Sequence, residues 1–327
     1  MKHPWKDDLL PLMPERLATA LGALSDGPSA HLQEIRLRAQ GPLMIVADGR
    51  DSYLNPEGCR SSSPAAALCP TQEEVAQLLE AMAQHSLYRM EEQLRQGYMT
   101  LPQGYRVGLC GQAVVEGGSI RYLQPVAGMA IRIARQVTGC AKAVMGYLLK
   151  GDGGVHATLI VSPPGLGKTT LLRDLTRLIS LGGPGHPGRR VGLVDERSEL
   201  AACYRGVPQL DVGPRTDVLD GCPKDQGMAL LLRALSPKML VCDEIAGVGD
   251  AQAILAARAA GVGVIATCHG ASLEQVRLRP GMDLLLRERV FERLVCLGAR
   301  GTPGQLASVI DLASGRELYA VDRSWTA

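Results

Sequence analysis

The sequence Ser162-Pro-Pro-Gly-Leu-Gly-Lys-Thr169 constrains this chain more than any other stretch. An apolar run precedes it and a helical pattern follows it, and it matches the phosphate-binding pattern G-x-x-x-x-G-K-[ST] except for Ser162 at the first glycine. Gly165 and Gly167 let backbone N–H groups converge on phosphate oxygens. Lys168 supplies a positive charge to the β- and γ-phosphates, and Thr169 offers a hydroxyl to Mg²⁺. The motif therefore predicts binding of ATP and Mg²⁺ by a loop comprising Ser162, Pro163, Pro164, Gly165, Leu166, Gly167, Lys168, Thr169 and Thr170.

Short apolar runs alternate with helical patterns in the second half of the chain. The runs have the composition of strands buried on both faces, and the patterns between them place Leu, Ile and Ala at helical spacing. This alternation predicts an α/β fold, a P-loop NTPase (RecA-like) domain with a doubly wound parallel sheet. Its strands are expected at Ala157–Val161, Val191–Val194, Met239–Cys242 and Val262–Ala266, and its helices around Leu171–Ile179 and Ala251–Ala260.

The first half predicts a smaller α+β domain. Residues 31–50 read as strand, turn and strand, and residues 51–70 read as a surface loop. Thr71–Glu74 forms a capping box that begins a helix to about Leu87, or as far as Leu94, and residues 97–115 read as a hairpin. We therefore expect an N-terminal docking or regulatory domain at residues 1–149.

A glycine-rich linker, Lys150–Gly154, is expected to separate that domain from the ATPase domain at residues 150–327. Beyond residue 285, short alternating segments predict a small antiparallel β appendage: Val290–Cys296, Leu306–Leu312 and Glu317–Val321.

Two carboxylates end the apolar run Met239–Glu244, about 70 residues after the loop. In a nucleotide site, Asp243 would hold Mg²⁺ through its water shell, and Glu244 would orient or deprotonate the attacking water. Without the upstream loop, the same pair would read equally well as a solvated turn.

Further candidates follow two other predicted strands, whose carboxyl ends line the nucleotide crevice in such folds. Asp195, Glu196 and Glu199 are candidate water-orienting carboxylates, although three acids beside a helix start can simply complement its dipole. His269 is a candidate sensor of the γ-phosphate, or else an ordinary strand-end imidazole.

An arginine supplied from a neighbouring subunit stabilises transferred phosphate in many P-loop enzymes. The candidates are Arg197, Arg215, Arg132 and Arg135, each of which can equally be a surface or ion-paired residue. A finger supplied in this way requires a head-to-tail interface, which can close as a ring.

Composition limits the partners. With 35 basic and 33 acidic residues the formal charge is +2, and aromatic residues make up 3% of the chain, which argues against nucleic acid as a ligand. The sequence predicts no direct transmembrane segment and a cytoplasmic location, so any association with a membrane would occur through a partner.

The loop, the acidic segment, the Asp-Glu strand and the histidine segment occur in the chain order of secretion-motor ATPases of type II and type IV secretion and pilus systems, which the sequence resembles. More closely, residues 194–224, with EIRLRAQGPL and GYRVGLCGQAV upstream, look like the stage III sporulation protein AA family. This resemblance covers roughly residues 30–325.

The resemblance implies an AAA+-type ATPase motor that forms a hexamer and docks on a membrane-embedded platform protein, on the mother-cell side of the channel to the forespore. It also places Glu199 where secretion motors have a glutamate often treated as the base. Those motors commonly have glycine in the position of Asp243, so the choice between Glu199 and Glu244 stays open. Two alternatives also remain open: an ATPase that binds single-stranded nucleic acid, and a nucleotide-gated scaffold without catalysis.

Overall fold

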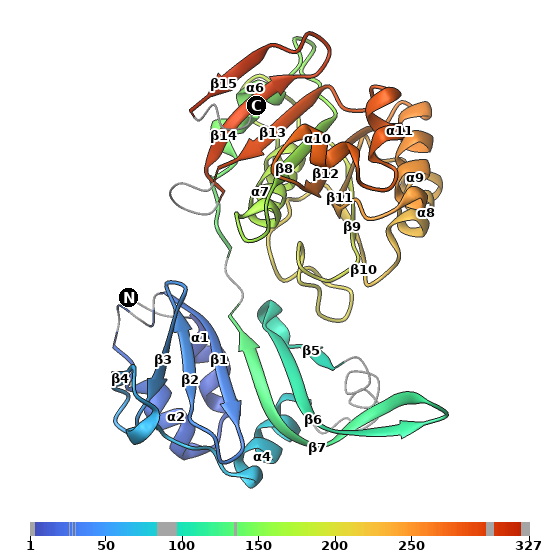
Figure 1. The fold of residues 1–327 in the computed structure, drawn as a ribbon. Coiled ribbons are helices and arrows are strands. Elements are labelled where there is room, and N and C mark those ends of the chain that lie inside the picture. The colour runs from blue at the N-terminus through green and yellow to red at the C-terminus, as the bar shows by residue number, and fades with distance from the viewer. Residues whose placement is uncertain are drawn as a thin grey trace. The chain divides into compact units, whose positions relative to one another are not determined.

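The computed structural model describes residues 4–25, 27, 29, 31–83, 97–133, 136–298 and 304–321. The chain divides into two units, Met1–Arg135 and Gln136–Ala327 (Figure 1). The boundary expected at residues 149/150 therefore lies inside the second unit. Helix α6 (Lys142–Leu148) explains the difference, because it buries Val144 and Leu148 in the core of that unit.

The first unit is an antiparallel sheet with helices. Its seven strands have the order β4-β3-β2-β1-β7-β6-β5, and apolar side chains of the sheet and helices share one core. The elements are α1 (Pro4–Leu9), η1 (Leu10–Leu12), α2 (Glu15–Gly22), β1 (Leu32–Arg38), β2 (Met44–Ala47), β3 (Arg50–Leu54), β4 (Arg60–Ser61), η2 (Pro64–Ala66), α4 (Gln72–Ala83), β5 (Tyr98–Thr100), η3 (Pro102–Gly104), β6 (Arg106–Glu116) and β7 (Ser119–Arg132).

The capping box is present as predicted. The Thr71 backbone N–H donates to Glu74 Oε2 at 2.7 Å, and the Glu74 N–H donates to Thr71 Oγ1 at 3.1 Å. The expected helix end near Leu87 or Leu94 lies outside the described residues. The predicted hairpin is the antiparallel pair β5–β6. The prediction of a loop over residues 51–70 was wrong in part, because β3 and β4 pair there without an apolar alternation that reveals them.

The second unit is the predicted α/β domain. Its eight-stranded sheet has the order β10-β9-β11-β12-β8-β13-β14-β15. In that order, each of the first six strands pairs in parallel with the next of the six. After α6 come β8 (Thr158–Ser162), α7 (Lys168–Leu181), β9 (Val191–Asp195), β10 (Thr216–Asp220), α8 (Lys224–Leu235), β11 (Met239–Glu244), α9 (Val248–Ala259), β12 (Gly263–His269), α10 (Leu273–Arg277), α11 (Met282–Arg287), β13 (Arg293–Leu297), β14 (Leu306–Asp311) and β15 (Glu317–Ala320).

Helices cover both faces of this sheet (Figure 1). Alternation along β8 sends Ile160 into a core with α6 and α7, and Leu159 and Val161 into a second core. The second core includes side chains of α8 and α9, such as Leu231 and Ile254. The doubly wound P-loop NTPase fold predicted from the strand and helix pattern is confirmed.

The last three strands are not an appendage. β13 pairs in parallel with β8, and β14 and β15 continue the same sheet in antiparallel fashion. Strand β12 pairs with one edge of β8, and β13 pairs with the other, so that neither edge of β8 is left with unpaired backbone groups. Among the described residues, no helix has the length and apolarity needed to cross a membrane.

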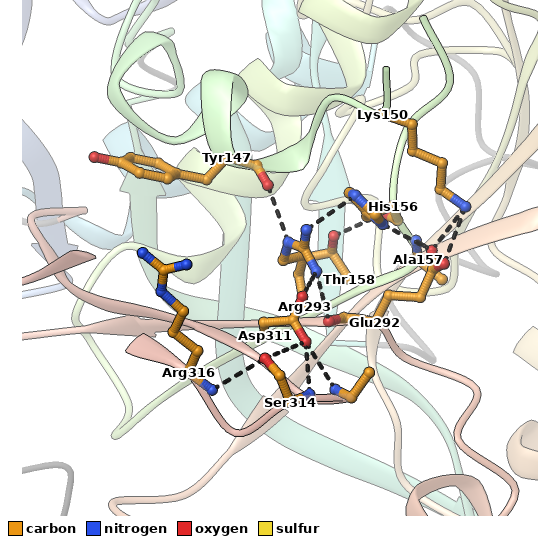
Figure 2. A network of polar contacts seen from close by, with 11 residues as sticks. Tyr147, Lys150, His156, Ala157, Thr158, Glu292, Arg293, Asp311, Ser314 and Arg316 are labelled. Carbon is orange, nitrogen blue, oxygen red and sulfur yellow. Dashed lines mark hydrogen bonds and ion pairs between the residues drawn. The ribbon is translucent and has the colours of Figure 1, made fainter. Parts of the chain in front are cut away.

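A polar network joins the amino ends of β8 and β13 (Figure 2). Arg293 donates to the Tyr147 carbonyl at 3.1 Å and to Asp311 Oδ2 at 2.6 Å, and its Nη2 faces His156 Nε2 at 3.0 Å. Lys150 Nζ lies 2.9 Å from Glu292 Oε2. The expected linker at residues 150–154 is therefore a turn anchored within the second unit.

We expect Arg293→Met to lower the free energy of unfolding by about 1–3 kcal/mol, since it removes a largely buried cation with four hydrogen-bond partners and leaves Asp311 without its guanidinium. Denaturant unfolding monitored by circular dichroism measures the change. Arg316→Met removes the same charge from an exposed position nearby and should change the free energy of unfolding little. Equal effects of the two substitutions would contradict a structural role for the network.

Candidate nucleotide-binding site

A pocket lies in the second unit where β8, β9, β11 and β12 end. The lining combines the phosphate-binding loop with acids and bases from the neighbouring strand ends, as the topology of a parallel sheet predicts. The lining residues are Gly165, Gly167, Lys168, Thr169, Thr170, Glu196, Arg197, Glu199, Lys224, Asp243, Glu244, Ala246, Thr267 and His269.

The loop has the backbone that a phosphate requires. Gly165 and Gly167 have φ of 79° and 86°, a conformation that favours glycine, and α7 begins directly afterwards at Lys168. Ser162 is the buried last residue of β8, where an extended backbone accepts any side chain. The departure from the usual glycine at this position is therefore compatible with the loop.

Lys168 is buried and folds back over the loop. Its Nζ donates to the carbonyls of Ser162 and Pro163 at 2.8 and 3.0 Å, and it lies 2.7 Å from His269 Nδ1. Burial lowers the pKa of Lys168 to about 8, and the charge of Glu244 opposes the shift. An anionic phosphate would restore the charge balance of this ammonium, which is the role that the motif assigns to it.

Glu244 is held by two bases. Its Oε2 lies 3.3 Å from His269 Nε2 and its Oε1 lies 3.4 Å from Arg279 Nη1. His269 therefore bridges Glu244 and Lys168 through its two ring nitrogens. The structure brings together the predicted strand-end acid, the predicted histidine and the loop lysine.

Asp243 also reaches the pocket, although it is adjacent to Glu244 in a strand. The pairing of β11 with β12 slips between Cys242 and Glu244, so that Asp243 is an extra residue. Such a bulge redirects side chains that would otherwise alternate between faces. Burial raises the pKa of Asp243, and the ammonium of Lys224 opposes the shift.

Lys224 faces these acids from the start of α8. Its Nζ contacts Glu196 Oε2 and lies 3.2 Å from Asp243 Oδ1. Burial alone would lower the pKa of Lys224, but the hydrogen bond to Glu196 and the charge of Asp243 raise it above its ordinary value. The sequence analysis missed this residue, and no local motif marks it.

The segment after β9 is shaped by Asp195. Its carboxylate accepts the N–H groups of Glu199, Leu200 and Ala201 at 2.8 to 2.9 Å. Burial raises the pKa of Asp195 to about 6 despite these donors. Asp195 therefore acts as a cap for the segment, one of the two alternatives left open, whereas Glu196 and Glu199 line the pocket.

The arginine candidates lie in different places. Arg197 lines the pocket. Arg215 donates to the carbonyls of Ser180 and Leu181 at the end of α7, at 2.9 and 3.2 Å. Arg132 lies 3.5 Å from Glu34 within the first unit, and Arg135 lies outside the described residues. Arg279, which contacts Glu244, was missed because no spacing ties it to the motifs.

The donors around Thr169 and Asp243 fit Mg²⁺. Asp243 Oδ1 is buried and faces the Lys224 ammonium at 3.2 Å, and Asp243 and Thr169 line the same pocket, so a carboxylate and a hydroxyl are both present there. Among the described residues, no group of three or more His, Cys, Asp or Glu side chains is arranged to hold a metal ion. Mg²⁺ commonly uses one or two protein oxygens and completes its shell with substrate phosphates and water.

Solved structures with the same fold include ATPases and a motor. The Legionella pneumophila ATPase DotB has a TM-score of 0.53 and 14% identity, with 97% of this chain and 79% of that chain covered. The pilus retraction motor PilT with bound ADP also has a TM-score of 0.53 and 14% identity, with 81% of this chain and 74% of that chain covered. At this identity, the likeness concerns the fold.

Sequence relatives identify the family. The stage III sporulation protein AA of Bacillus subtilis (strain 168) is 37% identical over 305 residues, which cover 93% of this chain and 95% of that protein. A family model described as sporulation stage III, protein AA matches residues 6–317. The resemblance stated from residues 194–224 is thus confirmed, and the chain belongs to the sporulation stage III protein AA family.

Proposed function

We propose that this protein binds ATP with Mg²⁺ and hydrolyses it. The observation that carries the proposal is the joint lining of one pocket by Lys168 and Thr169 of the loop and by Asp243 and Glu244 of the neighbouring strand. Phosphoryl transfer depends mainly on positioning and charge stabilisation, and these residues supply both. Family membership and the fold shared with ATPases support the proposal.

Each side chain of the pocket would have a separate role in hydrolysis. Lys168 would exchange the carbonyls it now contacts for the β- and γ-phosphates. Thr169 and Asp243 would hold Mg²⁺, which neutralises charge on the phosphates when it is bound. Glu244 is the better-placed candidate to accept the proton of the attacking water, since His269 and Arg279 orient both of its oxygens. Glu199 remains the second candidate.

We further propose that hydrolysis energises a secretion-like membrane complex between mother cell and forespore. A ring of six copies would complete each site with an arginine from the next copy, whereas Arg197 would act in the pocket of its own chain, which it lines. A membrane-embedded platform protein would place this ATPase at the inner face of the mother-cell membrane. The sporulation family and the shared fold with a pilus motor support this role.

The test measures ATP turnover by the full chain against protein concentration, together with its mass by light scattering. Catalysis completed by a neighbour should rise steeply with assembly, and EDTA should abolish it. A turnover rate per chain that stays constant while the mass increases would contradict catalysis at the subunit interface. Absence of turnover under every condition would favour the nucleotide-gated scaffold instead.

Binding of single-stranded nucleic acid is the remaining alternative. Scarce aromatic residues and a formal charge of +2 argue against the stacking platform and basic groove that such ligands need. We expect single-stranded DNA and RNA neither to change mobility nor to stimulate hydrolysis at low salt. Stimulation by either would overturn this expectation.

A further inference from the structure

Lys224 places a buried ammonium group between two carboxylates of the pocket. Its side chain is 4% exposed, whereas that of Asp243 is 12% and that of Glu196 is 37% exposed. Asp243 belongs to β11 and Glu196 follows β9, and these strands are neighbours in the sheet. One lysine therefore contacts two acids that the parallel sheet brings to the same edge, and balances one of their two charges.

The fold fixes this position through close packing of α8. Gly227 lies one turn after Lys224, and a Cβ there would come within 2.8 Å of Cys222 Sγ and of a Val194 methyl carbon. Only a residue without a side chain allows the start of α8 to approach β9 so closely. The close packing of α8 against β9 therefore fixes the position of the Lys224 backbone, and the side chain is buried.

Without the lysine, the pair would attract metal ions. Glu196 and Asp243 both contact the one ammonium, and carboxylate oxygens are the ligands that Mg²⁺ and Mn²⁺ prefer. A fixed positive charge at hydrogen-bond distance opposes the entry of a second cation, and the repulsion is stronger in the protein than in water.

We propose that Lys224 is an internal counter-cation that keeps free divalent metal ions out of the Glu196–Asp243 pair, so that the metal enters only in complex with the nucleotide phosphates. The inference rests on the proposed function, because it takes this pocket to be the site of magnesium nucleotide. It assigns Lys224 a positioning and gating role that the loop motif does not include.

The test measures Mn²⁺ binding to the nucleotide-free full chain at pH 8 by electron paramagnetic resonance. We expect Lys224→Met to bind one Mn²⁺ about tenfold or more tightly than the unmodified protein, because a neighbouring positive charge is removed from a partly buried acid pair. Lys238→Met is the matched control. It removes the same charge from an exposed lysine just before β11, at the opposite end of the strand from Asp243, and should leave Mn²⁺ binding unchanged.

Further variants locate the effect. Adding Glu196→Gln to Lys224→Met should reverse the gain, and Lys224→Arg should show none, since a cation is retained. Lys224→Gln replaces Lys224→Met if circular dichroism shows that the methionine variant is unfolded, with the same expected gain. A folded variant without the lysine that binds Mn²⁺ as weakly as the unmodified protein would overturn the inference.

The inference and the proposed function can fail separately. Binding of a fluorescent ADP analogue in EDTA tests the nucleotide site in the unmodified protein without any metal. If the unmodified protein does not bind the ADP analogue, the proposed function is overturned. Retained nucleotide binding with no Mn²⁺ gain in the Lys224 variants would overturn the inference alone.

Discussion

Replacing Lys168 with alanine is expected to reduce ATP turnover by about 10²–10³-fold or to abolish it, as the loss of one preorganised charge at the transferred phosphate does in other enzymes. The ammonium now donates to the Ser162 and Pro163 carbonyls, at 2.8 and 3.0 Å, and would exchange them for phosphate oxygens when ATP binds. The measurement is steady-state phosphate release at saturating ATP. It should be accompanied by affinity for fluorescent ADP, which should also fall.

Lys238→Ala is the control for loss of a positive charge. It changes an exposed lysine outside the pocket and should hydrolyse ATP at the unmodified rate. Both variants should unfold at nearly the same temperature, because Lys168 is a buried cation whose removal relieves desolvation as well as removing hydrogen bonds. Undiminished turnover in a folded Lys168→Ala protein would end the assignment of this loop as the catalytic phosphate site.

Replacing Glu244 with glutamine is expected to lower the rate of hydrolysis by about 10²–10⁴-fold, the usual contribution of a general base, while ATP still binds. Glutamine keeps the size of the side chain but cannot accept the proton of the attacking water. Single-turnover experiments with labelled ATP should therefore find intact ATP retained on the protein after gel filtration. The loop residues proposed to bind the phosphates are unchanged in this variant.

Glu199→Gln decides between the two candidate bases. If Glu199 activates water, this variant traps ATP and Glu244→Gln does not. Glu274→Gln, at an exposed position on α10, controls for the charge change. Full hydrolysis in all three variants would contradict a carboxylate base at this site and leave binding without catalysis as the function.

Much of the second unit follows from local sequence. The parallel strands β8, β9, β11 and β12 each have five consecutive buried, mostly apolar residues, and such runs read the same in any context that covers both faces of a sheet. The capping box at Thr71–Glu74 likewise depends on neighbours in sequence and was predicted correctly. Strand β10 was missed because its residues are only partly buried and lack a clear period.

The strands at the C-terminal end show the opposite case. Their alternation was visible, but pairing of β13 with β8 joins segments more than a hundred residues apart. A local sequence pattern predicts that a strand exists, but it does not predict which neighbouring strand the new strand pairs with. The linker predicted at residues 150–154 was wrong for the same reason, because the contact of Lys150 with Glu292 that anchors this turn is long-range.

By itself, the sequence determined the phosphate-binding loop, the class of fold and the acids at the ends of the strands, because these depend on short motifs and periodicity. Only the tertiary structure decided how the acids act together. The bulge at Asp243 turns two consecutive carboxylates into one pocket. The start of α8 brings Lys224 between Asp243 and Glu196, and the segment after α10 brings Arg279 to Glu244. These contacts join residues distant in the chain, and electrostatic pairing over such distances in sequence leaves no local pattern.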